Sequence, residues 1–164
     1  MTLLAIDGPA GAGKTTFAAK LEAELSVDGT VRVIHMDDLY NGWDNALSNP
    51  LSEILDRIST AHIAGREFVI KIFNWHIMQF DREEIVTPTD YLIIEGVGSG
   101  HTSLRKEVSQ AIWVEADENL LLDRVVQRDG EVVRDEMLIW KARERAYFEL
   151  HEVKKAAQIH LRGQ

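Results

Sequence analysis

Residues 1–16, MTLLAIDGPAGAGKTT, decide the fold of this chain. The apolar run from Thr2 to Ile6 predicts a short buried strand. The residues after Asp7 match the P-loop pattern G-x-x-x-x-G-K-[ST], and they are Gly8, Pro9, Ala10, Gly11, Ala12, Gly13, Lys14 and Thr15. Phe17, Leu21 and Leu25 then recur at a helical spacing, which predicts a helix that begins near Thr16. A strand, a glycine-rich loop and a helix in this order predict a phosphate-binding site.

Each residue type in this loop has a physical role. Glycine permits the positive φ angles that turn successive backbone N–H groups toward one point, and a helix N-terminus adds its positive dipole there. Lys14 would reach the β- and γ-phosphates, and the Thr15 hydroxyl would bind Mg²⁺. We therefore expect residues 8–16 to bind a nucleoside triphosphate with Mg²⁺. The sequence contains no Asn-Lys-x-Asp run of the guanine-binding type, so ATP is the expected nucleotide.

Composition excludes several classes of protein. With 164 residues, 45% of them hydrophobic and 27% charged, the chain is expected to fold as a single soluble domain, residues 1–164. Its net charge of −9 argues against a nucleic-acid polymer as partner, because such binding surfaces are usually basic. Without cysteine the chain has no disulfide and no thiolate nucleophile, which suits the cytoplasm. Neither a leader nor a membrane-spanning run is recognised, so no membrane association is expected.

The apolar runs predict an α/β fold. Strands alternate with helical segments, which is typical of a doubly wound parallel sheet of the P-loop NTPase type. About five strands are expected, near residues 2–6, 31–36, 91–95, 111–114 and 157–161. Residues 66–89 are β-prone but interrupt the alternation, so we expect a hairpin over the site. Residues 128–135 would form a small lid, and a long helix is expected from Glu136 to Lys155.

Acidic residues follow two of the predicted strands. Asp37 and Asp38 come after strand 31–36, and Glu95 ends strand 91–95 in the form of a Walker B segment. Because ligands bind at the carboxyl ends of parallel strands, these carboxylates would lie near the phosphates. Asp37 would act as a general base or, like Glu95, in the magnesium shell. The alternative for Asp37 and Asp38 is an ordinary solvated loop.

Two further sets of residues are candidates for the site. Three arginines flank the predicted lid: Arg124, Arg128 and Arg134. Together they would stabilise a transferring phosphoryl group, whereas any one of them alone is typical of the basic end of a helix. Four aromatic residues lie in segments expected around the site: Tyr40, Trp43, Phe73 and Trp75. They would either stack on a base or fill the core.

Several short runs resemble the uridine kinase family, and its short bacterial members most of all. They occur in the family's order: the P-loop, Asp37-Asp38-Leu39-Tyr40, Phe73-Asn74-Trp75, Glu95-Gly96, and Arg128-Asp129 through Arg134-Asp135. The resemblance implies that Asp37 accepts the proton of the acceptor hydroxyl and that Glu95 belongs to the magnesium shell. It implies that Arg128 and Arg134 are lid arginines, and that a nucleoside pocket is lined by Tyr40, Phe73, Trp75 and His76. The family usually has Asp where Asn74 stands, and the lid of this chain is shorter.

The sequence therefore predicts an enzyme. We expect an ATP- and Mg²⁺-dependent phosphotransferase that moves the γ-phosphoryl group to a hydroxyl of a small molecule, most specifically the 5′-hydroxyl of a pyrimidine nucleoside. Lys14, Asp37, Arg128 and Arg134 are its expected catalytic residues. Two alternatives stay open: a kinase for another acceptor, such as a nucleoside monophosphate, a sugar acid or another metabolite, and a non-catalytic ATP-binding regulatory module. The sequence does not decide the oligomeric state.

Overall fold

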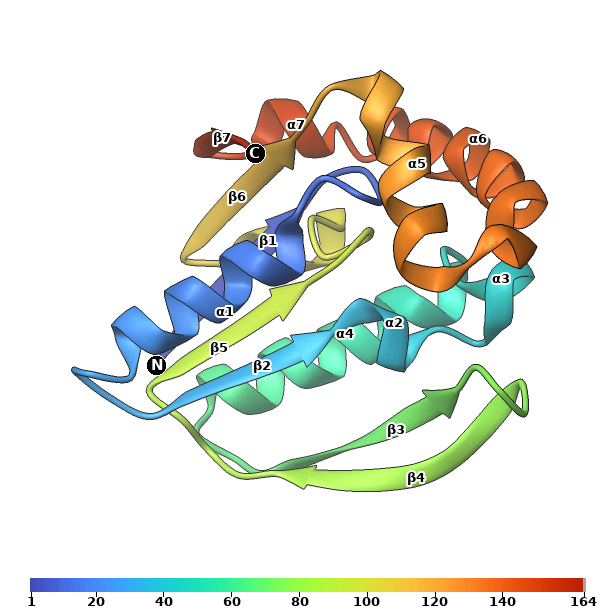
Figure 1. Ribbon diagram of the computed structural model, residues 1–164. Helices are drawn as coiled ribbons and strands as arrows, with labels where there is room; N and C mark the ends of the chain where they lie inside the picture. Colours follow the sequence, from blue (N-terminus) through green and yellow to red (C-terminus); the bar gives the residue numbers. More distant parts are fainter. Residues whose placement is uncertain (164) are drawn as a thin grey trace.

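A parallel sheet of five strands forms the centre of the computed structural model, which describes residues 1–163 (Figure 1). The strands lie in the order β2-β5-β1-β6-β7. Their bounds are Thr2–Asp7 for β1, Val31–His35 for β2, Tyr91–Glu95 for β5, Gln110–Glu115 for β6 and Ile159–Arg162 for β7. The predicted α/β fold is confirmed, including its last strand, which pairs in parallel with β6.

Helices cover both faces of the sheet because the residues of β1 alternate between two cores. Leu4 and Ile6 pack on the face covered by α1 (Lys14–Leu25). Leu3 packs on the opposite face, which α4 (Asn49–Ile63) covers, and Figure 1 shows α1 and α4 on either side of the strands. A strand buried on both faces reads as a continuous apolar run, which is the pattern of residues 2–6.

The segment expected over the site forms a hairpin with a sheet of its own. β3 (Phe68–Asn74) and β4 (Gln79–Val86) pair in antiparallel fashion. Alternate residues of β3 are buried, Ile70 among them at 1% exposure, so one face of the hairpin packs on the domain. Arg32 of β2 bonds Glu84 of β4 at 2.5 Å, and this ion pair ties the hairpin to the edge of the central sheet.

The remaining helices are short except for two. Their bounds are Met36–Leu39 for α2, Gly42–Asn45 for α3, Thr102–Lys106 for the 3₁₀ helix η1, Glu118–Asp129 for α5, Glu131–Val133 for the 3₁₀ helix η2, Arg134–Leu150 for α6 and Val153–Ala156 for α7. The Asp117 carboxylate accepts a hydrogen bond from the Asn119 N–H at 3.0 Å and so caps α5. Within residues 1–163, the helices are all too short or too polar to cross a membrane.

The predicted helix from Glu136 to Lys155 is wrong at its C-terminal end. α6 ends at Leu150, and Glu152 then takes a left-handed φ of 46°, through which a helix does not continue. The carbonyl oxygen of His151 accepts a hydrogen bond from the Arg105 guanidinium instead of from a next helical turn. The chain resumes as α7 and leads directly into β7.

Candidate active site

The P-loop lies between β1 and α1, and two of its glycines pack directly on neighbouring backbone. Gly8 and Gly11 have φ angles of 145° and 82°. A Cβ at Gly8 would lie 1.9 Å from the carbonyl oxygen of Val114, and one at Gly11 would lie 2.4 Å from that of Leu121. Both positions therefore require glycine, and the loop is held closely against β6 and α5.

Lys14 begins α1 and its side chain folds back over the P-loop. The side-chain Nζ donates hydrogen bonds to the carbonyl oxygens of Gly8 and Pro9, at 2.8 and 2.9 Å. The residue is 8% exposed, and Gly13 precedes it as the N-cap of α1. The ammonium charge thus adds to the positive end of the α1 dipole, and the loop offers a positive potential to phosphate groups.

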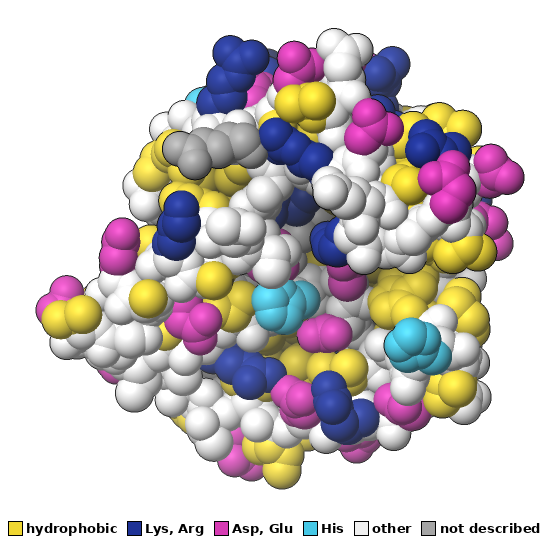
Figure 2. Space-filling view, in the orientation of Figure 1, with side chains coloured by type: hydrophobic (Ala, Val, Ile, Leu, Met, Phe, Trp, Pro, Cys, Tyr) yellow, Lys and Arg dark blue, Asp and Glu magenta, His cyan; other side chains and the backbone are white. Residues whose placement is uncertain are grey.

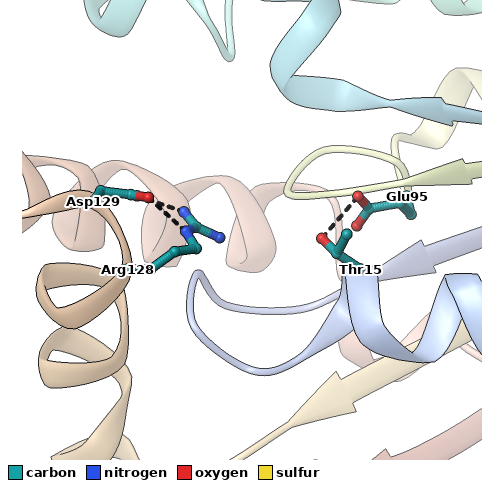
Figure 3. Close-up of polar contacts among 4 residues, drawn as sticks. All are labelled: Thr15, Glu95, Arg128 and Asp129. Carbon is teal, nitrogen blue, oxygen red and sulfur yellow. Dashed lines mark hydrogen bonds and ion pairs between the residues drawn. The ribbon is translucent and has the colours of Figure 1, made fainter.

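Thr15 and Glu95 lie together where α1 begins and β5 ends (Figure 3). The Thr15 hydroxyl donates to Glu95 Oε1 at 3.0 Å. The Nδ1 atom of His35 lies 2.6 Å from the same oxygen, and this hydrogen bond raises the pKa of His35. The second oxygen, Glu95 Oε2, is buried and has no hydrogen-bond partner among the described residues. A hydroxyl beside a carboxylate with a free oxygen is a donor set that suits Mg²⁺.

Few protein ligands converge at this point. In the part of the chain that the structure describes, no three or more His, Cys, Asp or Glu side chains are arranged to hold a metal ion. Mg²⁺ commonly binds through one or two carboxylates and keeps its other positions for water and phosphate oxygens. Thr15 and Glu95 therefore fit an ion that arrives with a nucleotide better than one held by the protein alone.

Asp37 lies on α2 and faces the same site. One side of the residue is open to solvent, but the surrounding protein desolvates the carboxyl group and raises its pKa. The positive charges of Lys14 and Arg128 lower that pKa, and the negative charge of Glu95 raises it. Four charged side chains from α1, α2, β5 and α5 thus act on one another in one place.

The two predicted lid arginines occupy different positions. Arg128, near the end of α5, bonds Asp129 through two nitrogen atoms at 2.7 and 2.6 Å. Figure 3 shows its guanidinium on the side of α5 that faces Thr15 and Glu95. Arg134, at the start of α6, pairs with Glu131 at the surface. The charge of Arg128 acts on Asp37, whereas Arg134 is not among the charges that act on it most strongly.

Aromatic side chains from α3, β3 and the hairpin turn gather beside Asp37. The ring centroids of Trp43 and Trp75 are 5.0 Å apart, as are those of Phe73 and Trp75. The indole Nε1 of Trp75 donates to the backbone carbonyl of Asp37 at 3.0 Å. The hairpin is thereby joined to the helix that carries the candidate base.

A cavity of about 340 Å³ opens next to these rings, between α3, the hairpin turn and α6. Phe73, Met78 and Ile139 supply apolar walls, and Arg143 supplies a charge. Tyr40 is only 2% exposed and so supports this region from within, whereas His76 is exposed in the hairpin turn. Figure 2 shows a separate hollow near the centre of the view, with basic, acidic and histidine side chains around it, whereas α3, the hairpin turn and α6 lie toward the right-hand edge (Figure 1).

Two buried carboxylates beside the P-loop were not expected from the sequence. Asp7 is 2% exposed and accepts hydrogen bonds from three backbone N–H groups, and burial raises its pKa to about 6. Glu144 of α6 is 3% exposed and accepts a hydrogen bond from the Ala10 N–H at 3.0 Å, and burial raises its pKa to about 7. The position of Asp7 at the end of an apolar strand is a usable signal. No sequence signal marks Glu144 or His35 as part of the site, because their hydrogen-bond partners are distant in the sequence.

Comparisons with known proteins agree with this architecture. A family model described as an AAA domain matches residues 4–149. A possible uridine kinase from Bacillus stearothermophilus is similar in structure, with 20% identity, a TM-score of 0.68 and coverage of 98% of this chain and 88% of that chain. A proposed fructose transport system kinase from Silicibacter sp. TM1040 shows 22% identity, a TM-score of 0.67 and coverage of 97% and 88%. A shikimate kinase from Bacteroides thetaiotaomicron shows 13% identity and a TM-score of 0.55, with coverage of 99% of this chain and 86% of that chain. Among curated protein sequences, none matches significantly.

The family match includes the P-loop, Asp37, Glu95 and Arg128. At identities of 13 to 22%, what the solved structures share with this chain is the fold. The chain therefore belongs to the AAA domain family, as an ATP-binding P-loop protein with the fold of a small kinase.

Proposed function

We propose that this protein is a small-molecule kinase that transfers the γ-phosphoryl group of ATP to the 5′-hydroxyl of a pyrimidine nucleoside. The proposal rests on Asp37, on whose carboxyl group the charges of Lys14, Glu95 and Arg128 act, and which Trp75 connects to a cavity with aromatic walls. A regulatory ATP-binding module needs only the phosphate loop, whereas a base and an additional pocket serve an acceptor. ATP and nucleosides meet in the cytoplasm, which is the compartment we propose.

On the nucleotide side, the backbone of residues 8–16 and the Lys14 ammonium bind the phosphates. Thr15 and Glu95 would hold Mg²⁺, and Asp37, whose pKa the negative charge of Glu95 raises, is the further candidate for its shell. When bound, Mg²⁺ neutralises charge on the β- and γ-phosphate oxygens. The buried free oxygen of Glu95 supports this assignment, because a buried acceptor without a partner is costly unless a ligand satisfies it.

On the acceptor side, Asp37 takes the proton of the attacking hydroxyl. An efficient base has a pKa near the working pH, and the desolvation that raises the pKa of Asp37 moves it in that direction. Lys14 and Arg128 oppose the shift and keep the carboxylate available as a base. Arg128 also stabilises the negative charge that develops on the transferring phosphoryl group. For Arg134 we propose a place in the lid, away from this charge.

The cavity favours a nucleoside over a nucleoside monophosphate. Its positive charge comes from Arg143, which is already bonded to Asp44 at 2.6 Å and to the Trp43 carbonyl at 2.9 Å. An acceptor that carried its own phosphate would call for further free cations. Trp43 is half-buried and lines the cavity, so it offers an aromatic wall for a flat base, whereas Phe73 is only 4% exposed and supports that wall. Asn74, where the uridine kinases usually have Asp, bonds Asp81 at 2.6 Å and so serves the hairpin itself.

The test is ATP consumption with Mg²⁺ against uridine, cytidine, purine nucleosides, nucleoside monophosphates and simple sugars. Stimulation by uridine or cytidine that disappears in Asp37→Asn and persists in Asp38→Asn supports the proposal. Asp38 is the matched control because it is the adjacent carboxylate on the same short helix. Stimulation by another acceptor would replace the nucleoside, and ATP binding without stimulation by any acceptor would favour the regulatory module.

A further inference from the structure

Helix α6 passes behind the P-loop and places a carboxylate directly on its backbone. Glu144 Oε2 accepts a hydrogen bond from the Ala10 N–H at 3.0 Å and another from the Trp140 indole Nε1 at 3.1 Å. The two bonded segments are 134 residues apart in the sequence, so this contact is made only in the folded domain. Ala10 lies in the first half of the loop whose other amides are expected to face the phosphates.

Burying this carboxylate has a cost that packing alone would not require. Glu144 is 3% exposed, and desolvation raises its pKa to about 7 although Ala10, Lys14 and Trp140 all favour the charged form. The negative charge of Asp7 acts against it as well. A buried polar group is tolerated when its hydrogen bonds fix a structure that an apolar side chain would leave free. Here the structure that is fixed is the phosphate loop.

The same helix also contacts the acceptor side of the site. Arg143, the residue before Glu144, donates hydrogen bonds to Trp43 and Asp44 of α3, which borders the aromatic cavity. One turn later, the Tyr147 hydroxyl donates to the carbonyl oxygen of Gly98, in the loop after β5. Adjacent residues of α6 thus bind two separate parts of the site: Glu144 binds the P-loop, and Arg143 binds α3 at the border of the aromatic cavity.

We propose that Glu144 is a positioning residue that sets the conformation of the P-loop and links it, through α6, to the wall of the acceptor cavity. By accepting the Ala10 N–H, the carboxylate turns that amide away from the phosphates. The Ala12 N–H is bonded to the Pro9 carbonyl oxygen at 3.1 Å, so the phosphates are left to the amides of residues 13–15. The inference rests on nucleotide binding by the P-loop and does not depend on which acceptor the enzyme uses.

The first experiment compares nucleotide affinity, measured by calorimetry with Mg²⁺ and a non-hydrolysable ATP analogue. Glu144→Ala removes the acceptor of the Ala10 N–H and should weaken binding about tenfold, since a charged hydrogen bond is lost. Glu144→Gln keeps a carbonyl acceptor and should stay within about twofold of wild type. Glu149→Ala is the matched control, because Glu149 is exposed on the same helix. If Glu144→Ala binds the analogue as tightly as wild type, or more tightly, the carboxylate does not position the loop.

A second measurement needs no alanine variant and no nucleotide. In ¹⁵N-labelled protein, the Ala10 amide resonance should shift with pH, with a midpoint near the Glu144 pKa of about 7, and Glu144→Gln should abolish that shift. An Ala10 amide that titrates equally in wild type and Glu144→Gln would overturn the proposal. Because this readout is independent of ATP, failure of the kinase proposal and failure of the positioning proposal remain distinguishable.

Discussion

Replacing Glu144 by Gln should remove a pH dependence of stability that the fold contains. Burial raises the pKa of this carboxyl group from its ordinary value of 4.5 to about 7. The folded protein then binds more protons than the unfolded chain between these values. The contribution of Glu144 to the free energy of unfolding is therefore fully present below the unfolded pKa and is lost as pH rises through the folded pKa. At about 1.4 kcal/mol per pKa unit the whole effect is about 3.4 kcal/mol, and about 2.5 kcal/mol of it is lost between about pH 5 and pH 8.

Histidines with lowered pKa values contribute to the pH dependence of the free energy of unfolding with a sign opposite to that of Glu144. Burial lowers the pKa of His101 to about 4 and also lowers the pKa values of His62 and His151. These groups reduce stability as pH falls through the ordinary histidine range, which is opposite in sign to the effect of Glu144. They are present in both proteins, so the difference between wild type and variant isolates the carboxyl group.

The assay is urea unfolding at a series of pH values, followed by the fluorescence of the four tryptophans. The free energy of unfolding of wild type minus that of Glu144→Gln should fall by about 2.5 kcal/mol from about pH 5 to pH 8. Glu149→Gln, an exposed change on the same helix, should reproduce the wild-type curve. Parallel curves for wild type and Glu144→Gln would refute the claim that burial holds this proton.

Three further predictions concern the reaction. Lys14→Ala should weaken Mg²⁺–ATP binding at least about 100-fold in calorimetry, because it removes the ammonium that lies over the P-loop. Asp37→Asn should lower kcat by about 10²–10⁴ with little change in nucleotide affinity. In wild type, kcat should rise with pH through the raised pKa of Asp37 and then level off, and a flat wild-type profile would contradict its role as base. Arg128→Met should lower kcat by about 10³ or more in single-turnover assays, because the charge of Arg128 acts at the site. Arg134→Met breaks only a surface ion pair and should change kcat less than about threefold. Equal losses in the two variants would place both arginines at the phosphoryl group.

The phosphate-binding part of the site could be predicted because its residues are nearly consecutive. Residues 8–15 carry the backbone geometry, the ammonium and the hydroxyl within one loop, and the apolar strand before them identifies the sheet. Asp37 and Glu95 could be added because parallel strands direct their carboxyl ends to one edge. The separate hairpin of residues 68–86 was likewise foreshadowed by a β-prone run that breaks the strand–helix alternation.

What the sequence could not provide are contacts between distant segments. His35 shares an oxygen of Glu95 with Thr15, and Glu144 binds Ala10, yet each of these residues looks locally like an ordinary polar residue. The end of α6 was missed for the same reason. No helix-breaking residue stands at positions 150–152, and the Arg105 side chain that satisfies the His151 carbonyl comes from the 3₁₀ helix before β6.

The backbone pairing of the hairpin is separate from that of the central sheet, although its buried face packs on the domain. Within residues 1–163, β3 and β4 share no hydrogen-bonded ladder with the central strands (Figure 1). Insertions or exchanges in residues 66–89 would therefore not displace the register that holds the P-loop and Glu95. If the proposed function is right, changes in residues 66–89 would alter the acceptor while the P-loop and Glu95 stay in place. A chimaera in which residues 66–89 come from a kinase with a different acceptor should prefer that acceptor and keep its affinity for ATP.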